Sequence, residues 1–229
     1  MNSIINKGLH SNSRHDLLNR TGLYIIIILS IILFVPLFTF RAIGPFDFWY
    51  WMSSNLIIMI TLSLILDKKY LSFLNHDFRS GTLKKIFWGI VSAVILYFVF
   101  YFGNTITRYL FDFAGQGIEQ VYGFKGSAAP IRIVLLMLVI IGPGEEIFWR
   151  GVLQRNLEKR MGKWAGFIIG TIIYTGVHVF TGNVMLIVAA LVAGLFWGYM
   201  FMRYKSMLMN VVSHTIWDIT VFVFLPFHA

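Results

Sequence analysis

The sequence predicts an all-α fold, a bundle of about seven transmembrane helices with a cytoplasmic N-terminus. Three observations lead to this prediction: the composition, the long apolar runs and the distribution of basic residues. Of the 229 residues, 58% are hydrophobic and 13% are charged, whereas soluble domains are roughly half apolar and a quarter charged. Such a balance cannot keep a globular surface hydrated, so we expect a multi-pass protein of the cell membrane.

Seven apolar runs are long enough to cross a bilayer, whose hydrocarbon core needs about 20 residues of helix. Backbone polar groups in lipid must pair within the segment, so each run is expected to be helical. In chain order the runs cover residues 22–40, 48–66, 84–106, 131–152, 164–180, 184–202 and 206–226. No small-residue cleavage site follows the first run, which is therefore expected to be a span rather than a signal peptide.

The chain is interpreted as a single integral membrane domain over residues 1–229. It begins with a cytoplasmic tail (1–21), continues through three N-terminal spans (22–106) and ends in a core of four spans (130–226). The stretch from about Gly103 to Pro130 is the longest external segment. Because it is rich in glycine, it is expected to be irregular.

The distribution of Lys and Arg indicates the orientation, because cytoplasmic loops carry an excess of these residues. One side of the membrane receives Lys7, Arg14, Arg20, Lys68, Lys69, Arg79, Lys84, Lys85, Arg155, Lys159, Arg160, Lys163, Arg203 and Lys205. The other side receives only Arg41, Arg108, Lys125 and Arg132. This asymmetry places the N-terminus in the cytoplasm. It also explains the net charge of +9 by membrane topology, so nucleic acid is excluded as a partner.

Six ionisable residues lie inside the expected spans, away from the span ends. They are Glu145, Glu146, Arg150, His178, His214 and Asp218. Charged groups inside a membrane are costly and mark functional sites. The six residues occupy three spans at similar depths. The sequence therefore predicts one polar pocket that gathers them and opens to the cytoplasmic side.

Spacing gives the two adjacent glutamates different roles. Glu146 and Arg150 are four residues apart, so they share a helix face and can pair. Glu145 is turned away from Glu146 by about 100°. One glutamate is therefore expected to pair with Arg150, while the other faces His178 and His214. Two histidines and a carboxylate from three helices predict either a general-base site or a metal site.

Several other intramembrane chemistries lack their residues in this chain. The helical HExxH zinc motif and the GxSxG nucleophile motif are both absent. Asp218 has no second intramembrane Asp with which to form an aspartyl dyad. The carboxylate–histidine site that remains suits activation of water for hydrolysis, and it would also suit translocation of protons or metal ions.

Three short motifs carry these residues in order, each on a separate span. They are EEIFWRG (Glu145 to Gly151), YTGVH (Tyr174 to His178) and HTIWD (His214 to Asp218). Over about residues 130–226 the chain resembles the CPBP family, the CAAX proteases and bacteriocin-processing enzymes also called Abi. The resemblance implies an intramembrane endopeptidase, with the four spans as its catalytic core. The implied substrate is membrane-associated: a CAAX-type prenylated protein, a bacteriocin precursor or a signalling peptide.

The resemblance also implies roles for the motif residues. Glu145 and His178 would activate a water molecule, and His214 and Asp218 would hold the carbonyl oxygen. Asp218 stands where Asn is more familiar, and an ionised Asp cannot donate to an oxyanion. It is therefore expected to be protonated, to orient His214 or to help bind a metal.

Two residues of the first motif have a supporting role under the same resemblance. Glu146 and Arg150 would orient the motif. Tyr174 takes the place of the usual Phe in the second motif. Tyr174 and Trp217 are expected to pack rather than to take part in chemistry.

The sequence leaves metal dependence and catalysis itself open. Water activation without a permanent metal is the preferred hypothesis. If a divalent metal such as zinc is bound, Glu145, His178 and His214 are the candidate ligands, with a water in the open position. The alternative functions are a non-catalytic membrane adaptor or bacteriocin self-immunity protein and, third, a proton-coupled carrier, for which no inverted repeat is evident.

Overall fold

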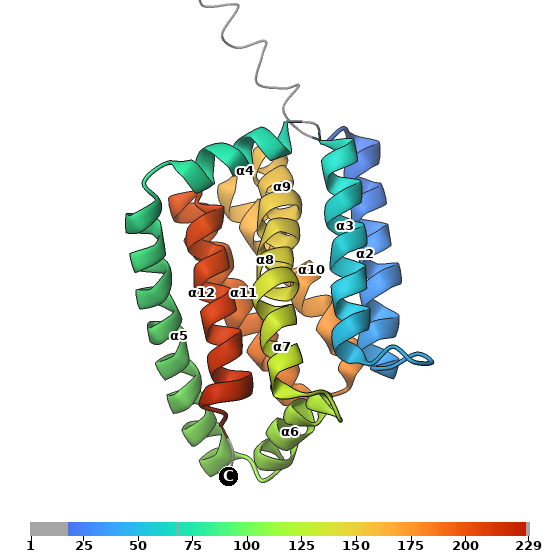
Figure 1. Ribbon diagram of the computed structural model, residues 1–229, viewed down its shortest axis with the longest axis vertical. Helices are drawn as coiled ribbons and strands as arrows, with labels where there is room; N and C mark the ends of the chain where they lie inside the picture. The colour runs from blue at the N-terminus through green and yellow to red at the C-terminus, as the bar shows by residue number, and fades with distance from the viewer. Residues whose placement is uncertain (1–17, 68, 228–229) are drawn as a thin grey trace, which may run out of the picture.

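The computed structural model describes residues 18–67 and 69–227 (Figure 1). Within these ranges the regular structure is helical throughout, which confirms the predicted fold class. The α-helices are α2 (Arg20–Phe40), α3 (Phe48–Leu66), α4 (Tyr70–Arg79), α5 (Thr82–Leu110), α6 (Phe113–Tyr122), α7 (Pro130–Leu136), α8 (Gly142–Glu145), α9 (Arg155–Met161), α10 (Lys163–His178), α11 (Val184–Tyr204) and α12 (Met207–Ile219). The predicted tail over 1–21 lies outside the described residues up to position 17.

Short π-helical and 3₁₀ segments continue several of these helices. The π-helical segments are η2 (Met137–Ile141), η3 (Glu146–Gln154) and η5 (Thr220–Phe224). The 3₁₀ segments are η1 (Gly123–Lys125) and η4 (Val179–Thr181). The segments from α7 to α9 follow one another without interruption over Pro130–Met161.

Six helices among the described residues are long and apolar enough to cross a membrane. They are Arg20–Phe40, Phe48–Leu66, Thr82–Leu110, Lys163–Thr181, Val184–Tyr204 and Met207–Phe224. A seventh is formed by Pro130–Met161 together with Phe113–Lys125, to which it is joined at a bend of 87°. Each of the seven predicted runs falls on one of these segments. Large apolar side chains such as Ile32, Phe98 and Val139 are exposed on their outer faces, where lipid would cover them.

The helix that carries the third motif, α12, packs at the centre of the bundle. It contacts α5 on one side and the α8–η3 segment on the other (Figure 1). The approach to α5 depends on Gly89, because a Cβ atom there would lie 2.8 Å from Cβ of Val212. α2 packs with α3, and α10 packs with α11. The three motif-bearing segments therefore face one another inside the bundle.

The segment from about Gly103 to Pro130, predicted to be external and irregular, is mainly helical. α5 continues to Leu110 and is followed by α6, which closes one end of the bundle (Figure 1). Asn183 at the start of α11 donates from Nδ2 to the carbonyl of Gly117 at 2.7 Å. A Cβ atom at Gly117 would lie 2.8 Å from Cγ of Met185. The prediction was wrong because glycine in this segment permits close packing of α6 on α11.

A further helix, α4, lies in the segment between the second and third spans, for which no helix was predicted. It packs across the end of the bundle opposite α6 (Figure 1). Its buried residues are Tyr70 and Asp77.

Candidate active site

The six ionisable residues predicted to share a site are all buried in the bundle interior. Their side chains come from three segments: α8–η3, the end of α10, and α12. The exposed fractions are 6% for Glu145, 0% for Glu146, 2% for Arg150, 7% for His178, 3% for His214 and 7% for Asp218. Buried charges require charged or hydrogen-bonding partners, so the contacts among the six define what each one can do.

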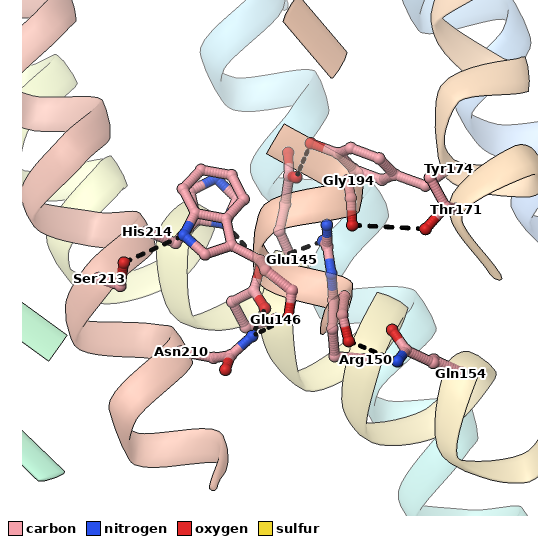
Figure 2. A network of polar contacts seen from close by, with 12 residues as sticks. Glu145, Glu146, Arg150, Gln154, Thr171, Tyr174, Gly194, Asn210, Ser213 and His214 are labelled. Carbon is pink, nitrogen blue, oxygen red and sulfur yellow. Dashed lines mark hydrogen bonds and ion pairs between the residues drawn. The ribbon is translucent and has the colours of Figure 1, made fainter. Parts of the chain in front are cut away.

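Glu146 is the centre of the polar network (Figure 2). Its Oε1 lies 2.7 Å from Nδ1 of His214 and 3.0 Å from Nη1 of Arg150. Its Oε2 accepts a hydrogen bond from Nδ2 of Asn210 at 2.8 Å. The expected pairing of one glutamate with Arg150 is found at Glu146. Glu146 also contacts His214, which was expected to face the other glutamate. Glu145 lines the same cavity as His178 and His214.

Asn210 is a site residue that the sequence analysis missed. It lies one helical turn before His214 on α12, so both side chains project from one face toward Glu146. Its Nδ2 also donates to the carbonyl of Trp197 at 2.9 Å. The spacing of four residues to His214, which is repeated from His214 to Asp218, is the signal that would have identified it.

Glu145 faces the aromatic side chain of the second motif. The Tyr174 hydroxyl donates to Oε2 of Glu145 at 3.2 Å (Figure 2). The guanidinium carbon of Arg150 lies 4.4 Å from the centre of the Tyr174 ring. Tyr174 was expected only to pack, but its hydroxyl contacts Glu145 and its ring contacts Arg150, two of the three ionisable groups of the first motif.

His178 is held so that one ring nitrogen remains available. Its Nδ1 lies 2.8 Å from the backbone carbonyl of Tyr174, and a carbonyl can only accept, so Nδ1 carries the proton. In a neutral ring Nε2 is then the basic nitrogen. The Phe38 ring packs on the imidazole with centroids 4.3 Å apart. This arrangement fixes the tautomer that a general base requires.

His214 has a carboxylate beside each ring nitrogen. Nδ1 faces Glu146, and Nε2 lies 3.4 Å from Oδ2 of Asp218. The ring stacks on Trp197 with centroids 3.6 Å apart and planes 18° apart. Trp197 is itself fixed, because its Nε1 donates to the Ser213 hydroxyl at 3.1 Å. The contacts of Asp218 favour its expected role of orienting His214.

A cavity of about 330 Å³ lies beside these residues. The four predicted catalytic residues, Glu145, His178, His214 and Asp218, all line it, as does Tyr174. Glu146 and Arg150 are not part of its wall and lie behind it. The rest of the lining is mainly apolar and aromatic. The structure thus places four of the six residues at the cavity wall and the ion pair of Glu146 and Arg150 behind it.

The cavity extends toward the α6 end of the bundle. Its lining includes Gly103 and Thr107 near the end of α5, and Tyr122 of α6. Within the described residues, none from α4 or α9 contributes to its wall. The pocket was predicted to open toward the basic loops, which cluster at the α4 and α9 end, and the position of the cavity does not support this. The side of the membrane that each end faces stays a prediction.

The candidate metal ligands do not form a metal-binding cluster. In the part of the chain that the structure describes, no three His, Asp or Glu side chains are positioned to hold an ion. Nδ1 of His214 is engaged by Glu146 and Nε2 is directed at Asp218. The set Glu145, His178 and His214 therefore does not fit a metal in this arrangement.

The GPG sequence before the glutamates permits close helix packing. A Cβ atom at Gly142 would lie 2.2 Å from Oγ1 and 3.0 Å from Cα of Thr215, the residue after His214. Only glycine therefore allows α8 and α12 to approach this closely. Pro143 lacks an amide donor, and the segment that contains it is flanked by the π-helical turns η2 and η3.

We expect Gly142→Ala to destabilise the protein by about 1–3 kcal/mol, because the added methyl group must displace the backbone of α12. Thermal unfolding in detergent would measure this loss. Gly176→Ala is the matched control: Gly176 also lies in a membrane helix, and nothing lies within 4 Å of a Cβ atom there. Equal unfolding temperatures for the two variants would contradict the packing role of Gly142.

Comparison with known proteins identifies one family. Residues 127–220 match the model of the family described as type II CAAX prenyl endopeptidase Rce1-like. The matched range includes all three motifs and the six buried ionisable residues, and it confirms the resemblance derived from them. No curated protein and no solved structure matches the chain.

Proposed function

We propose that this chain is a membrane-embedded protease that hydrolyses a peptide bond with a water activated by Glu145 and His178. The premise is the match of residues 127–220 to the Rce1-like family of type II CAAX prenyl endopeptidases. The family match and the apolar helices support a CAAX-type protease that is embedded in a membrane. The observation that carries the finer proposal is the shared cavity. All four predicted catalytic residues line it, while their supporting ion pair lies behind.

In the proposed mechanism Glu145 is the general base. It takes a proton from a water molecule as the water oxygen bonds to the peptide carbonyl carbon. Nε2 of His178 accepts a hydrogen bond from the same water, since Nδ1 is committed to the Tyr174 carbonyl. When the carbon–nitrogen bond breaks, Glu145 returns its proton to the leaving amine. The Tyr174 hydroxyl holds the Glu145 carboxylate in place throughout.

His214 stabilises the oxyanion in this proposal. Its Nδ1 donates to Glu146, and its Nε2–H, which lies 3.4 Å from Oδ2 of Asp218 at the cavity wall, is shared between Asp218 and the oxyanion when a substrate is bound. A hydrogen-bond donor fixed at the position where negative charge develops stabilises the transition state most strongly in a site that excludes water. Asp218 keeps the ring oriented and does not itself donate to the oxyanion, which resolves the difficulty raised by an Asp at this position.

The proposed substrate is a membrane-associated peptide that carries an isoprenyl group near its C-terminus. Support comes from the cavity wall, where aromatic and aliphatic side chains such as Phe48, Met52, Phe100 and Trp217 surround the polar residues. The cavity volume of about 330 Å³ lies at the lower end of the range of small-molecule pockets. It suits a short peptide segment or part of a lipid chain.

The direct test is cleavage by purified protein in lipid vesicles. A synthetic peptide ending in a farnesylated CAAX sequence would be incubated with the protein, and the products identified by mass spectrometry. We expect release of the C-terminal tripeptide, with less cleavage of the same peptide without the farnesyl group. A bacteriocin-type precursor peptide serves as a third substrate. Intact peptides in all three incubations would argue for a non-catalytic adaptor.

A further inference from the structure

The helix α4 lies outside residues 127–220, the range that matches the family model. It packs across one end of the bundle (Figure 1), and its buried side chains are Tyr70, 0% exposed, and Asp77, 5% exposed. Since the two residues are about two helical turns apart, they project from the same face of α4. Each makes a hydrogen bond to a different helix of the candidate active site.

Tyr70 contacts the segment that carries the first motif. Its hydroxyl donates to the carbonyl of Ile147 at 2.6 Å, and Ile147 follows Glu146 directly in η3. Burial raises the pKa of Tyr70, so the hydroxyl keeps its proton and remains a donor. The contact depends on Gly151, the last residue of the first motif, because a Cβ atom there would lie 1.8 Å from the Tyr70 oxygen.

Asp77 contacts the start of the helix that carries the third motif. Its Oδ2 accepts from the backbone N–H of Leu208 at 2.8 Å and from the Ser206 hydroxyl at 3.3 Å. Its Oδ1 pairs with Nζ of Lys85 at 2.6 Å. A carboxylate at this position satisfies one of the amides left free at a helix N-terminus and interacts favourably with the helix dipole. Asp77 therefore fixes the first turn of α12.

The two segments that α4 contacts, η3 and α12, also contact each other through the polar network. Glu146 of η3 reaches His214 at 2.7 Å and Asn210 at 2.8 Å, both on α12. We propose that α4 is a brace that sets the position of η3 relative to α12, with Tyr70 and Asp77 as positioning residues for the reaction. The kinetic part of this inference rests on the proposed function, whereas the structural part does not.

The brace predicts a loss of turnover rather than of substrate binding, because neither residue lines the cavity. A displacement of about 1 Å in reacting groups can reduce a rate by a factor of about 10². For Tyr70→Phe and Asp77→Ala we expect kcat to fall at least about tenfold, with KM nearly unchanged. Asp77→Asn retains an oxygen acceptor for the Leu208 amide and is expected to restore much of the lost kcat.

Two control variants remove a tyrosine hydroxyl and an aspartate charge at exposed positions outside α4. Tyr101→Phe removes a hydroxyl from an exposed position on α5, and Asp112→Asn removes a charge from an exposed position next to α6. Both should keep the wild-type kcat, and thermal unfolding of every variant would confirm that it folds. A rise in KM at unchanged kcat, or a kcat equal to that of the controls, would contradict the brace.

Hydrogen exchange measured by mass spectrometry tests the brace without reference to activity. In Tyr70→Phe the backbone amides of Glu146–Gln154 should exchange faster than in the wild type, while those of α10 should not change. If the wild type cleaves no peptide but this difference is found, the proposed function fails and the brace stands. If the wild type is active but exchange and kcat are both unaffected by Tyr70→Phe, the brace alone fails.

Discussion

Replacing Glu145 with Gln should reduce peptide cleavage by about a hundredfold or more, which is the contribution expected from a general base. Gln has the same shape and keeps an oxygen that can accept from the Tyr174 hydroxyl, which lies 3.2 Å from Oε2 of Glu145. It cannot take a proton from water at neutral pH. Initial rates of tripeptide release by purified protein in vesicles would measure the loss, and thermal unfolding should stay close to that of the wild type.

Glu119→Gln is the matched control for this variant, because it makes the same chemical change at an exposed position on α6. It should cleave the peptide at the wild-type rate. A Glu145→Gln protein that was equally active would remove Glu145 from the mechanism, whatever the other variants show.

Arg150→Met should produce the largest loss of stability, about 3–5 kcal/mol, as expected when one partner of a buried ion pair is removed. The Glu146 side chain is fully buried and lies 3.0 Å from Arg150. Without Arg150 its negative charge would be balanced only by His214. The contact of the guanidinium with the Tyr174 ring would also be lost. Equilibrium unfolding in detergent would measure the change.

Two further variants separate this effect from a general cost of losing a cation. Arg203→Met removes an exposed Arg near the end of α11 and should change stability by less than about 0.5 kcal/mol. Adding Glu146→Gln to Arg150→Met removes the unpaired charge, so the double variant should recover part of the stability. No recovery would mean that Arg150 acts through packing alone.

The spans and the burial of the six ionisable residues in one region of the bundle were predictable from the sequence. Apolar runs of about 20 residues are defined by the thickness of a bilayer, and the segments found, such as Phe48–Leu66, match the predicted run in both bounds. The six buried ionisable residues were recognisable because charge is rare and costly in such runs. Both predictions depend on composition and length, which need no knowledge of how helices pack.

The partners within the site were less predictable. Spacing of four residues identified Arg150 as a partner of Glu146, but the contact between Glu146 and His214 depends on how α12 is rotated against η3. The π-helical turns of η3 also change the rotation per residue on which the separation of the two glutamates was based. Tyr174 looked like a packing residue because nothing in the sequence brings its hydroxyl to Glu145.

Two helices were not predicted for a related reason. In α6 glycine suggested irregular structure, and only the neighbouring side chain of Met185 shows why Gly117 is required. In α4 the segment between two spans was used only for its basic residues, whereas its buried Tyr70 and Asp77 have partners far away in the sequence. Tertiary contacts determine both segments, so local patterns could not identify them.

The most direct test of the central claim is hydrolysis of a farnesylated CAAX peptide in water labelled with ¹⁸O, with and without a metal chelator. The account predicts that one ¹⁸O atom enters the new C-terminal carboxylate of the farnesylated fragment, at the same rate in both conditions. No cleavage, or a rate that is lost with the chelator and restored by zinc, would contradict a water activated by Glu145 and His178 alone.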